Sequence, residues 1–160
     1  MYETCIIIPY RNRKKDLDYF LKHSWPLIKN NVKDCLLLIV EQEDGKLFNR
    51  GKVINCGFDF IKKDIKYFIF HDVDLNPKDK IIHLYKKDIE KNNILGIVNS
   101  PCITLGGIIK INKEDFVEMN GFPNNFWGWG VEDRALYNRS IFNNKKIKYN
   151  HYTNDKNIND

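Results

Sequence analysis

The sequence of 160 residues contains one alanine, five prolines and four cysteines, and no two cysteines form a C-x-x-C pair. The missing pair argues against a zinc knuckle and a thioredoxin-like redox site. The low cysteine content excludes a disulfide-dense miniprotein. No stretch approaches the roughly 20 consecutive apolar residues of a membrane span, and the N-terminus has no charged segment followed by a cleavage site. We therefore expect no membrane span and a cytoplasmic location for the chain as given.

Hydrophobic residues make up 42% of the chain and charged residues 29%, which is typical of one globular domain and excludes a disordered tail or a collagen-like rod. The net charge of +5 suits an anionic small molecule as well as nucleic acid. No stretch consists of lysine and arginine alone, so we expect no nucleic-acid partner. Lysine, isoleucine and asparagine, whose codons are AT-rich, account for 62 of the 160 residues, so a single lysine or asparagine carries little functional weight.

Short apolar runs alternate along the chain with stretches of helical periodicity. The predicted strands are 4–8, 35–40, 67–70, 94–98, 103–111 and 147–149, and the predicted helices are 16–28, 51–62, 79–90, 113–119 and 132–142. This order predicts an α/β fold with a mainly parallel, twisted sheet flanked by helices. Such sheets bind ligands at the carboxyl ends of their strands, which points to residues 9–13, 41–42 and 71–74.

Two carboxylates, Asp72 and Asp74, flank Val73 at the end of a predicted buried strand. Residues i and i+2 of an extended chain point the same way, so both carboxylates could face one cation. Oxygen ligands of this kind suit Mg²⁺ or Mn²⁺, which usually also contact substrate phosphates. The alternative is a surface turn, because aspartate is also a good turn residue.

Arg11, Arg13 and Arg50 are three of only five arginines in a chain with 21 lysines. A guanidinium pairs with phosphate or carboxylate in a bidentate manner that an ammonium cannot match. Each of the three precedes a predicted helix, and helix N-termini also attract anions. We predict an anion site at these residues, the alternative being solvated charges at helix starts.

Residues 121–133 alternate large aromatic side chains with glycines, which is a poor way to build a plain core. The pattern suits a mobile loop that offers flat apolar faces to sugar rings. Glu132 and Asp133 follow at the start of a predicted helix, where a carboxylate is either a helix-start charge or a general base. The residues alone leave these two interpretations open.

His71 and His151 stand near polar clusters, and His151 is a possible metal ligand or simply an exposed histidine. All four cysteines lie in or beside apolar runs, where we expect them to be small buried hydrophobic residues. They are Cys5, Cys35, Cys56 and Cys102.

Five blocks of the sequence, taken in order, resemble the β-1,4-galactosyltransferase family, glycosyltransferase family seven. The blocks are 9–13 (PYRNR), 48–52 (FNRGK), 70–75 (FHDVDL), 106–107 (GG) and 120–133 (NGFPNNFWGWGVED). The resemblance covers roughly residues 5–140 and implies a GT-A-like nucleotide-sugar-binding fold. It also implies Mn²⁺, with Mg²⁺ as the alternative, as cofactor and an inverting transfer of a sugar from a UDP-sugar to a sugar hydroxyl.

By position, the resemblance implies that Asp133 is the catalytic base with Glu132 assisting, and that Asp74 and His151 bind the metal. It implies a donor site formed by Pro9, Arg11, Arg13, Phe48, Arg50, Asp72, Val73, Gly107 and Trp129. The chain is then one catalytic domain, 1–160, with a nucleotide-binding half at 1–75 and an acceptor and catalytic half at 94–160. Members of the family usually carry a membrane anchor, often in the Golgi, and a longer C-terminal segment. This sequence shows neither, so we expect it to be a minimal catalytic core.

Two departures from the family leave its substrates open. Arg134 and Ala135 stand where the family usually has further carboxylates that help to hold the acceptor. Thr104 stands where galactosyl enzymes often have tyrosine, so the donor is UDP-galactose or UDP-N-acetylgalactosamine and the acceptor is an unspecified carbohydrate. Two alternatives remain: a catalytically weak or inactive sugar-binding or sugar-nucleotide-binding module, and a metal phosphohydrolase built on His71 and Asp72.

Overall fold

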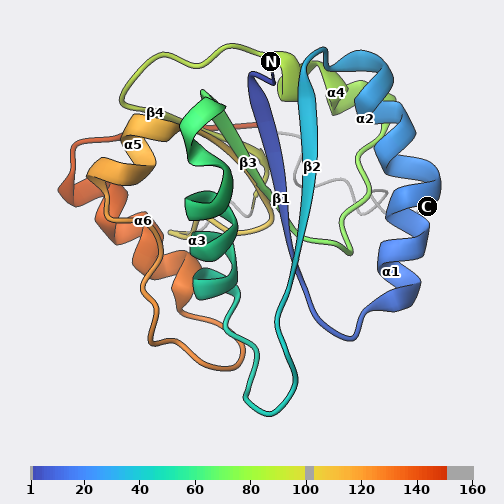
Figure 1. The fold of residues 1–160 in the computed structure, drawn as a ribbon. Helices are drawn as coiled ribbons and strands as arrows, with labels where there is room; N and C mark the ends of the chain where they lie inside the picture. Colours follow the sequence, from blue (N-terminus) through green and yellow to red (C-terminus); the bar gives the residue numbers. More distant parts are fainter. Residues whose placement is uncertain (1, 100–102, 151–160) are drawn as a thin grey trace.

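A six-stranded sheet forms the centre of the computed structural model, which describes residues 2–99 and 103–150 (Figure 1). The strands are β1 (Thr4–Tyr10), β2 (Cys35–Glu41), β3 (Tyr67–His71), β4 (Asn93–Val98), β5 (Ile108–Asn112) and β6 (Lys146–Tyr149). Their order across the sheet is β2-β1-β3-β5-β4-β6. The first half of the chain therefore supplies one side of the sheet and the second half the other.

The sheet is mainly parallel, as predicted, with β5 as the exception. Strand β1 runs parallel to β2 and β3, and β4 runs parallel to β6, whereas β5 is antiparallel to both of its neighbours. Strand β5 also begins at Ile108, later than the predicted start at residue 103. The residue before it, Gly107, has a φ of +72°, and a Cβ there would lie 2.3 Å from the carbonyl oxygen of Val98. This tight turn prevents the extended strand from starting earlier.

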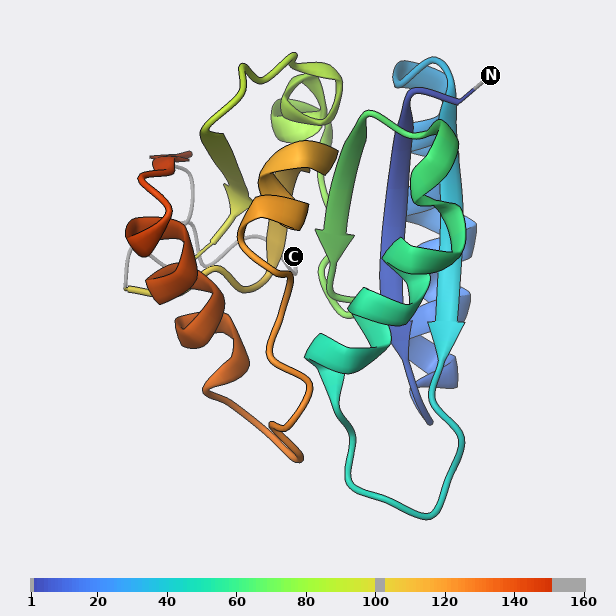
Figure 2. The ribbon, with the colours of Figure 1, turned by 60° about the vertical axis from the view of Figure 1, so that its left-hand side comes forward.

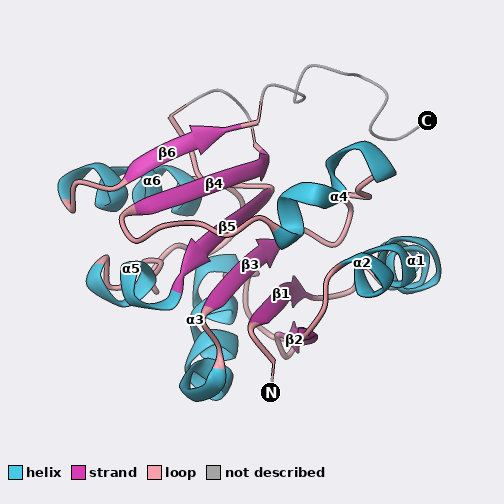
Figure 3. Ribbon diagram, turned by 90° about the horizontal axis from the view of Figure 1, so that it is seen from above, coloured by secondary structure: helices cyan, strands magenta, loops and turns pink. Residues whose placement is uncertain are grey.

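Within the described residues, six α-helices form two layers on the sheet: α1 (Lys14–Tyr19), α2 (Trp25–Asn31), α3 (Arg50–Ile61), α4 (Asp79–Lys86), α5 (Lys113–Glu118) and α6 (Glu132–Phe142). Helices α1, α2 and α4 cover one face, and α3, α5 and α6 cover the other (Figure 3). The single helix predicted over 16–28 is divided by a wide π-helical stretch, Phe20–Ser24. Pro26 follows two residues after this stretch, and its missing N–H removes a helical hydrogen bond at this point.

The continuous apolar runs of the sequence are explained by a core on each face of the sheet. In β1, Ile6 and Ile8 belong to the cluster that includes side chains of α2 and α4. Cys5 and Ile7 belong to the cluster that includes side chains of α3, α5 and α6. All four side chains are fully buried, as a strand covered on both faces requires.

The cysteines follow the prediction only in part. Cys5 and Cys35 are buried, and burial raises the pKa of both thiols to about 12, as expected of unreactive core residues. Cys56 is exposed, contrary to the prediction, because it lies on the outer side of α3. Cys102 lies outside the described residues. Among those residues, no helix is long and apolar enough to cross a membrane.

The carboxyl ends of β1, β2 and β3 meet at one edge of the sheet. Two long loops, 42–49 and 119–131, extend from the molecule at this edge (Figure 2). They touch there, since the N–H of Gly128 donates to the carbonyl oxygen of Phe48 at 2.8 Å. This edge is where an open α/β sheet binds its ligands.

Candidate active site

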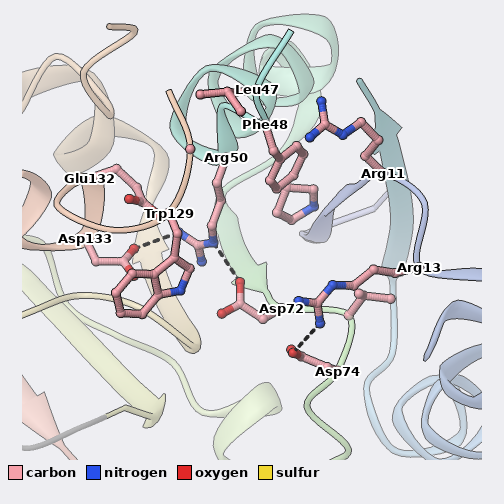
Figure 4. Close-up of a pocket in the computed structure, with 13 residues that line it drawn as sticks. Arg11, Arg13, Leu47, Phe48, Arg50, Asp72, Asp74, Trp129, Glu132 and Asp133 are labelled. Carbon is pink, nitrogen blue, oxygen red and sulfur yellow. Dashed lines mark hydrogen bonds and ion pairs between the residues drawn. The ribbon is translucent and has the colours of Figure 1, made fainter. Parts of the chain in front are cut away.

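A cavity of about 430 Å³ opens at this edge, between the strand ends and the start of α6 (Figure 4). Its lining consists of Pro9, Arg11, Arg13, Leu47, Phe48, Arg50, Asp72, Val73, Asp74, Gly128, Trp129, Glu132 and Asp133. The fold thus brings together every site residue predicted from the sequence except Gly107 and His151. Gly107 is not part of the lining, and His151 lies outside the described residues. Leu47 and Gly128 were not predicted, since neither carries a polar group that marks a site.

Arg50 lies at the centre of the cavity and joins its two carboxylate-bearing sides. Its Nε donates to Asp72 Oδ1 and its Nη1 to Asp133 Oδ1, both at 2.7 Å. Burial lowers the pKa of Arg50, but the carboxylates of Asp72 and Asp133 raise it above its ordinary value. Its Nη2 is buried and has no hydrogen-bond partner in the described part of the chain. A buried, unpaired guanidinium N–H is costly, so it indicates a place for an acceptor atom of a ligand.

The position of Arg50 follows from the local sequence. Arg50 begins α3, and Asn49 caps this helix by accepting a hydrogen bond from the N–H of Lys52 at 2.9 Å. The Asn49 side chain also donates to the carbonyl oxygen of Asn124 at 2.8 Å. The cap therefore holds the start of α3 against the loop that leads to α6.

Glu132 and Asp133 form the opposite wall of the cavity, in the first turn of α6. Burial raises the pKa of Asp133; Arg50 opposes the shift, and the charges of Glu132 and Asp72 add to it. Glu132 is buried, and its Oε2 has no partner among the described residues. Val131, directly before them, has a φ of +74°, a strained conformation for a β-branched residue. The first turn of α6 thus offers the Asp133 carboxylate, with its raised pKa, beside a buried oxygen atom of Glu132 that lacks a hydrogen-bond donor among the described residues.

The Asp133 carboxylate fills the space that a side chain at position 106 would need, which explains the glycine there. A Cβ at this position would lie 2.2 Å from Asp133 Oδ2, and Gly106 does not have a positive φ that would strain alanine. We expect Gly106→Ala to displace the Asp133 carboxylate and to lower turnover of the UDP-sugar that the family resemblance implies as substrate by about 100-fold, the cost of a misplacement near 1 Å. Binding of UDP alone is the control and should change little. Full turnover in the variant would show that the carboxylate position is not critical.

The turn that carries Asp72 and Asp74 is fixed from both sides. The N–H of Asp72 donates to the carbonyl oxygen of Gly107 at 3.2 Å. The carbonyl oxygen of Asp72 accepts a hydrogen bond from His71 Nδ1 at 2.9 Å. Gly107 and His71 therefore position this turn rather than line the cavity.

His71 is fully buried, and burial lowers its pKa to about 4. Because Nδ1 must donate to the Asp72 carbonyl, the neutral ring accepts at Nε2 from the Tyr85 hydroxyl, 2.9 Å away. Both ring nitrogens are thus engaged away from the cavity. This placement does not favour the phosphohydrolase alternative, which needs His71 in contact with a substrate.

Asp74 is the described residue best placed to bind a divalent metal. Its carboxylate is about half exposed, and one oxygen pairs with Arg13 Nη1 at 2.6 Å. Among the residues that the structure describes, no group of three His, Cys, Asp or Glu side chains could hold an ion by itself. The Asp74 carboxylate nevertheless fits Mg²⁺ or Mn²⁺, because these ions commonly share their coordination with substrate phosphates and water. Arg11 and Arg13, in the same cavity lining, could hold such phosphates nearby.

The remaining wall combines cations with flat apolar surfaces. Arg11 donates to the carbonyl oxygen of Lys46, and its guanidinium lies 5.3 Å from the ring centre of Phe48. Trp129 is fully exposed at the mouth of the cavity. Such surfaces can stack on a base or a sugar, while Arg11 and Arg13 attract an anion.

Two family models match the chain. One, described as the N-terminal region of glycosyl transferase group 7, matches residues 1–87. The other, described as the N-terminal domain of galactosyltransferase, matches residues 98–158. Together they cover both sides of the sheet and both walls of the cavity.

Individual relatives agree with these models. Human beta-1,4-galactosyltransferase 4 is 36% identical over 155 residues, which are 92% of this chain and 45% of that protein. Human beta-1,4-galactosyltransferase 1 is 34% identical over 154 residues, which are 91% of this chain and 38% of that protein. The chain thus spans less than half the length of these curated relatives.

Solved structures share the fold. A mutant of Drosophila β-1,4-galactosyltransferase 7 in complex with manganese, UDP-Gal and xylobiose matches with a TM-score of 0.85 at 27% identity, covering 97% of this chain and 69% of that one. A mannosyltransferase from Pyrobaculum calidifontis in complex with GDP-Man and Mn²⁺ matches with a TM-score of 0.65 at 10% identity, covering 96% of this chain and 56% of that one, a likeness of fold alone. The predicted GT-A-like fold is confirmed. Family models, relatives and fold together show that this chain belongs to glycosyl transferase group 7, the family of the β-1,4-galactosyltransferases.

Proposed function

We propose that the chain is a metal-dependent glycosyltransferase that moves a sugar from a UDP-sugar to a hydroxyl group of a carbohydrate acceptor. The observation that carries this proposal is the pair of buried, unpartnered atoms in one cavity, Arg50 Nη2 and Glu132 Oε2. The first requires an acceptor such as a phosphate oxygen, and the second requires a donor such as a sugar hydroxyl. A nucleotide sugar supplies both within one molecule.

The donor is proposed to lie along the cavity with its diphosphate near Arg11, Arg13 and Arg50. Pro9, Phe48 and Val73 add apolar surface for the nucleoside. The metal is proposed to bind Asp74, with His151 as a second ligand, and it would neutralise charge on the departing diphosphate. Arg13 pairs with Asp74 in the structure, and a metal bound at Asp74 would leave the Arg13 guanidinium to pair with the diphosphate.

Asp133 is proposed as the base that takes the proton from the acceptor hydroxyl. Its carboxylate lies at the far wall from Arg11 and Arg13 (Figure 4), so an acceptor held there faces the sugar opposite the leaving diphosphate. One base in this position suits a single displacement, which inverts the configuration at the anomeric carbon. Glu132 assists by binding a hydroxyl of the transferred sugar, and Trp129 covers the sugars.

Galactose is the proposed sugar, because the relatives are β-1,4-galactosyltransferases and one solved relative was in complex with UDP-Gal. Thr104 keeps N-acetylgalactosamine as the second candidate. Its smaller side chain, where galactosyl enzymes often have tyrosine, leaves room for an N-acetyl group.

The test is UDP release from UDP-galactose, UDP-N-acetylgalactosamine, UDP-glucose and UDP-N-acetylglucosamine, each with Mn²⁺, Mg²⁺ or EDTA. We expect slow, metal-dependent release that favours UDP-galactose, because water can replace the acceptor. We expect Asp74→Asn to lower this release by at least about tenfold and to weaken Mn²⁺ binding measured by electron paramagnetic resonance. Asp88→Asn, on an exposed aspartate beyond α4, is the matched control. UDP binding without release from any sugar would instead favour a sugar-nucleotide-binding module.

A further inference from the structure

We propose that Arg134 selects acceptors that carry a carboxylate or a sulfate close to the hydroxyl that receives the sugar. The inference rests on the proposed transferase function and adds the chemical class of the acceptor. The inference starts from Arg134, an exposed arginine next to the proposed base Asp133. The fold itself does not explain why an arginine stands at this position.

The position of Arg134 places it on the acceptor side. Arg11 and Arg13 lie at one end of the cavity, and Asp133 lies at the other (Figure 4). If the diphosphate binds to the arginines, the acceptor must approach from the Asp133 end. Arg134 is the next residue in the first turn of α6 and is exposed. Arg134 is not part of the cavity lining, so it would contact a group that an acceptor bound at Asp133 extends beyond the cavity.

A positive charge at position 134 does not stabilise the fold. Arg134 is the third residue of α6, where the partial positive charge of the helix N-terminus disfavours a cation and where glutamate is usual. Arg134 has no hydrogen-bond or ion-pair partner among residues 2–99 and 103–150. A residue that costs helix stability and has no intramolecular partner is best explained by an intermolecular one.

The other four arginines of the chain all have partners within it. They are Arg11 on the Lys46 carbonyl, Arg13 on Asp74, Arg50 on Asp72 and Asp133, and Arg139 on the carbonyls of Asn120 and Gly121. In a chain with 21 lysines, arginine is thus found where its guanidinium donates to oxygen atoms. Carboxylate and sulfate match this donor geometry better than a neutral hydroxyl does.

The charges around Asp133 make Arg134 the group that an anionic acceptor would have to pair with. Asp133 pairs with Arg50 at 2.7 Å, but Arg50 also pairs with Asp72, so the charge of Asp133 is offset only in part. Ala135 follows Arg134 and adds no carboxylate to the first turn of α6. Glu132 Oε2 has no partner among the described residues, so both acids of this turn keep negative charge and Arg134 is the positive charge beside them that could pair with an anionic acceptor.

The test compares matched acceptors that differ only in charge, with UDP-galactose and Mn²⁺ present. One pair is phenyl β-glucuronide and phenyl β-glucoside, and the other is N-acetylglucosamine 6-sulfate and N-acetylglucosamine. Product is measured by mass spectrometry, and the readout is the ratio of kcat/KM values within each pair. We expect the wild type to prefer a charged member by about tenfold, and the pair that shows this preference identifies carboxylate or sulfate.

Three variants assign the preference to the guanidinium. Arg134→Gln should reduce the ratio to about one, and Arg134→Lys should retain part of it. Lys63→Gln removes an exposed charge beyond the far end of α3 and should leave the ratio unchanged. Added salt should lower the wild-type ratio because it screens exposed charges.

Two results would overturn the inference while leaving the transferase function intact. The first is transfer to neutral acceptors at least as good as to charged ones, or no transfer to charged ones, by an enzyme that hydrolyses UDP-galactose. The second is an unchanged preference in Arg134→Gln. Failure to release UDP from any UDP-sugar would instead contradict the proposed function itself, and the inference with it.

Discussion

Replacing Asp133 with asparagine is expected to abolish nearly all sugar transfer while leaving the donor bound. The amide has almost the shape of the carboxylate and can still accept a hydrogen bond from Arg50, whose Nη1 lies 2.7 Å from Asp133 Oδ1. It cannot take a proton, so the loss should be about 100- to 10,000-fold, the usual contribution of a general base. UDP binding, measured by quenching of tryptophan fluorescence at Trp129, should change little.

The pH dependence provides an independent check on the same residue. Burial raises the pKa of Asp133, with Arg50 opposing the shift and Glu132 and Asp72 adding to it. A base acts only when deprotonated, so turnover should fall as the pH falls through this raised pKa. The acid limb should therefore lie above the ordinary aspartate value of about 3.9. It should be missing from the residual activity of Asp133→Asn, and an unchanged limb in that variant would assign the base elsewhere.

The second large effect is expected for Arg50, whose removal should damage stability and activity together. Arg50→Met keeps the length of the side chain but leaves the carboxylates of Asp72 and Asp133 without their shared cation. Breaking a buried ion pair from one side costs about 3–5 kcal/mol. We expect a loss of about 3 kcal/mol in the free energy of unfolding, because both aspartates are partly exposed. Urea unfolding measures this loss, and UDP release should become undetectable.

Two control variants separate the ion pair from the general cost of losing an arginine. Arg139→Met removes an arginine that donates only to the backbone carbonyl oxygens of Asn120 and Gly121, so it leaves no unpaired charge. The free energy of unfolding should therefore fall by less in Arg139→Met than in Arg50→Met. In an Asp133→Asn background, Arg50→Met should also cost less, since only Asp72 then loses its partner. Equal losses in all three cases would show that the two ion pairs contribute nothing specific.

The sequence predicts those parts of the site that depend on local position. Asp72 and Asp74 follow a recognisable buried strand, and the carboxyl end of a parallel strand is where ligands bind. Arg50 follows a helix cap, and Glu132 begins a helix, so both are found by local signals. The sequence could single out these residues because each lies at the end of an element with a clear periodicity, and the fold places all of them in one cavity.

The pairings between these residues depend on long-range packing and could not be predicted. Arg50 and Asp133 are 83 residues apart, and nothing in their local sequence indicates the ion pair. The role of Gly106 is equally hidden, because only the fold brings it to Asp133. The reversed direction of β5 was missed for the same reason: its apolar run is compatible with either direction.

The configuration of the first sugar released from UDP-galactose tests the proposed mechanism most directly. The donor is an α-linked glycoside, and water can replace the acceptor, so no knowledge of the acceptor is needed. Proton NMR spectra recorded early, before the anomers equilibrate, distinguish α- from β-galactose. We expect β-galactose first, in the presence of Mn²⁺, and about 100-fold less of it from Asp133→Asn. Release of α-galactose first, or equal release by the variant, would contradict a single displacement with Asp133 as its base.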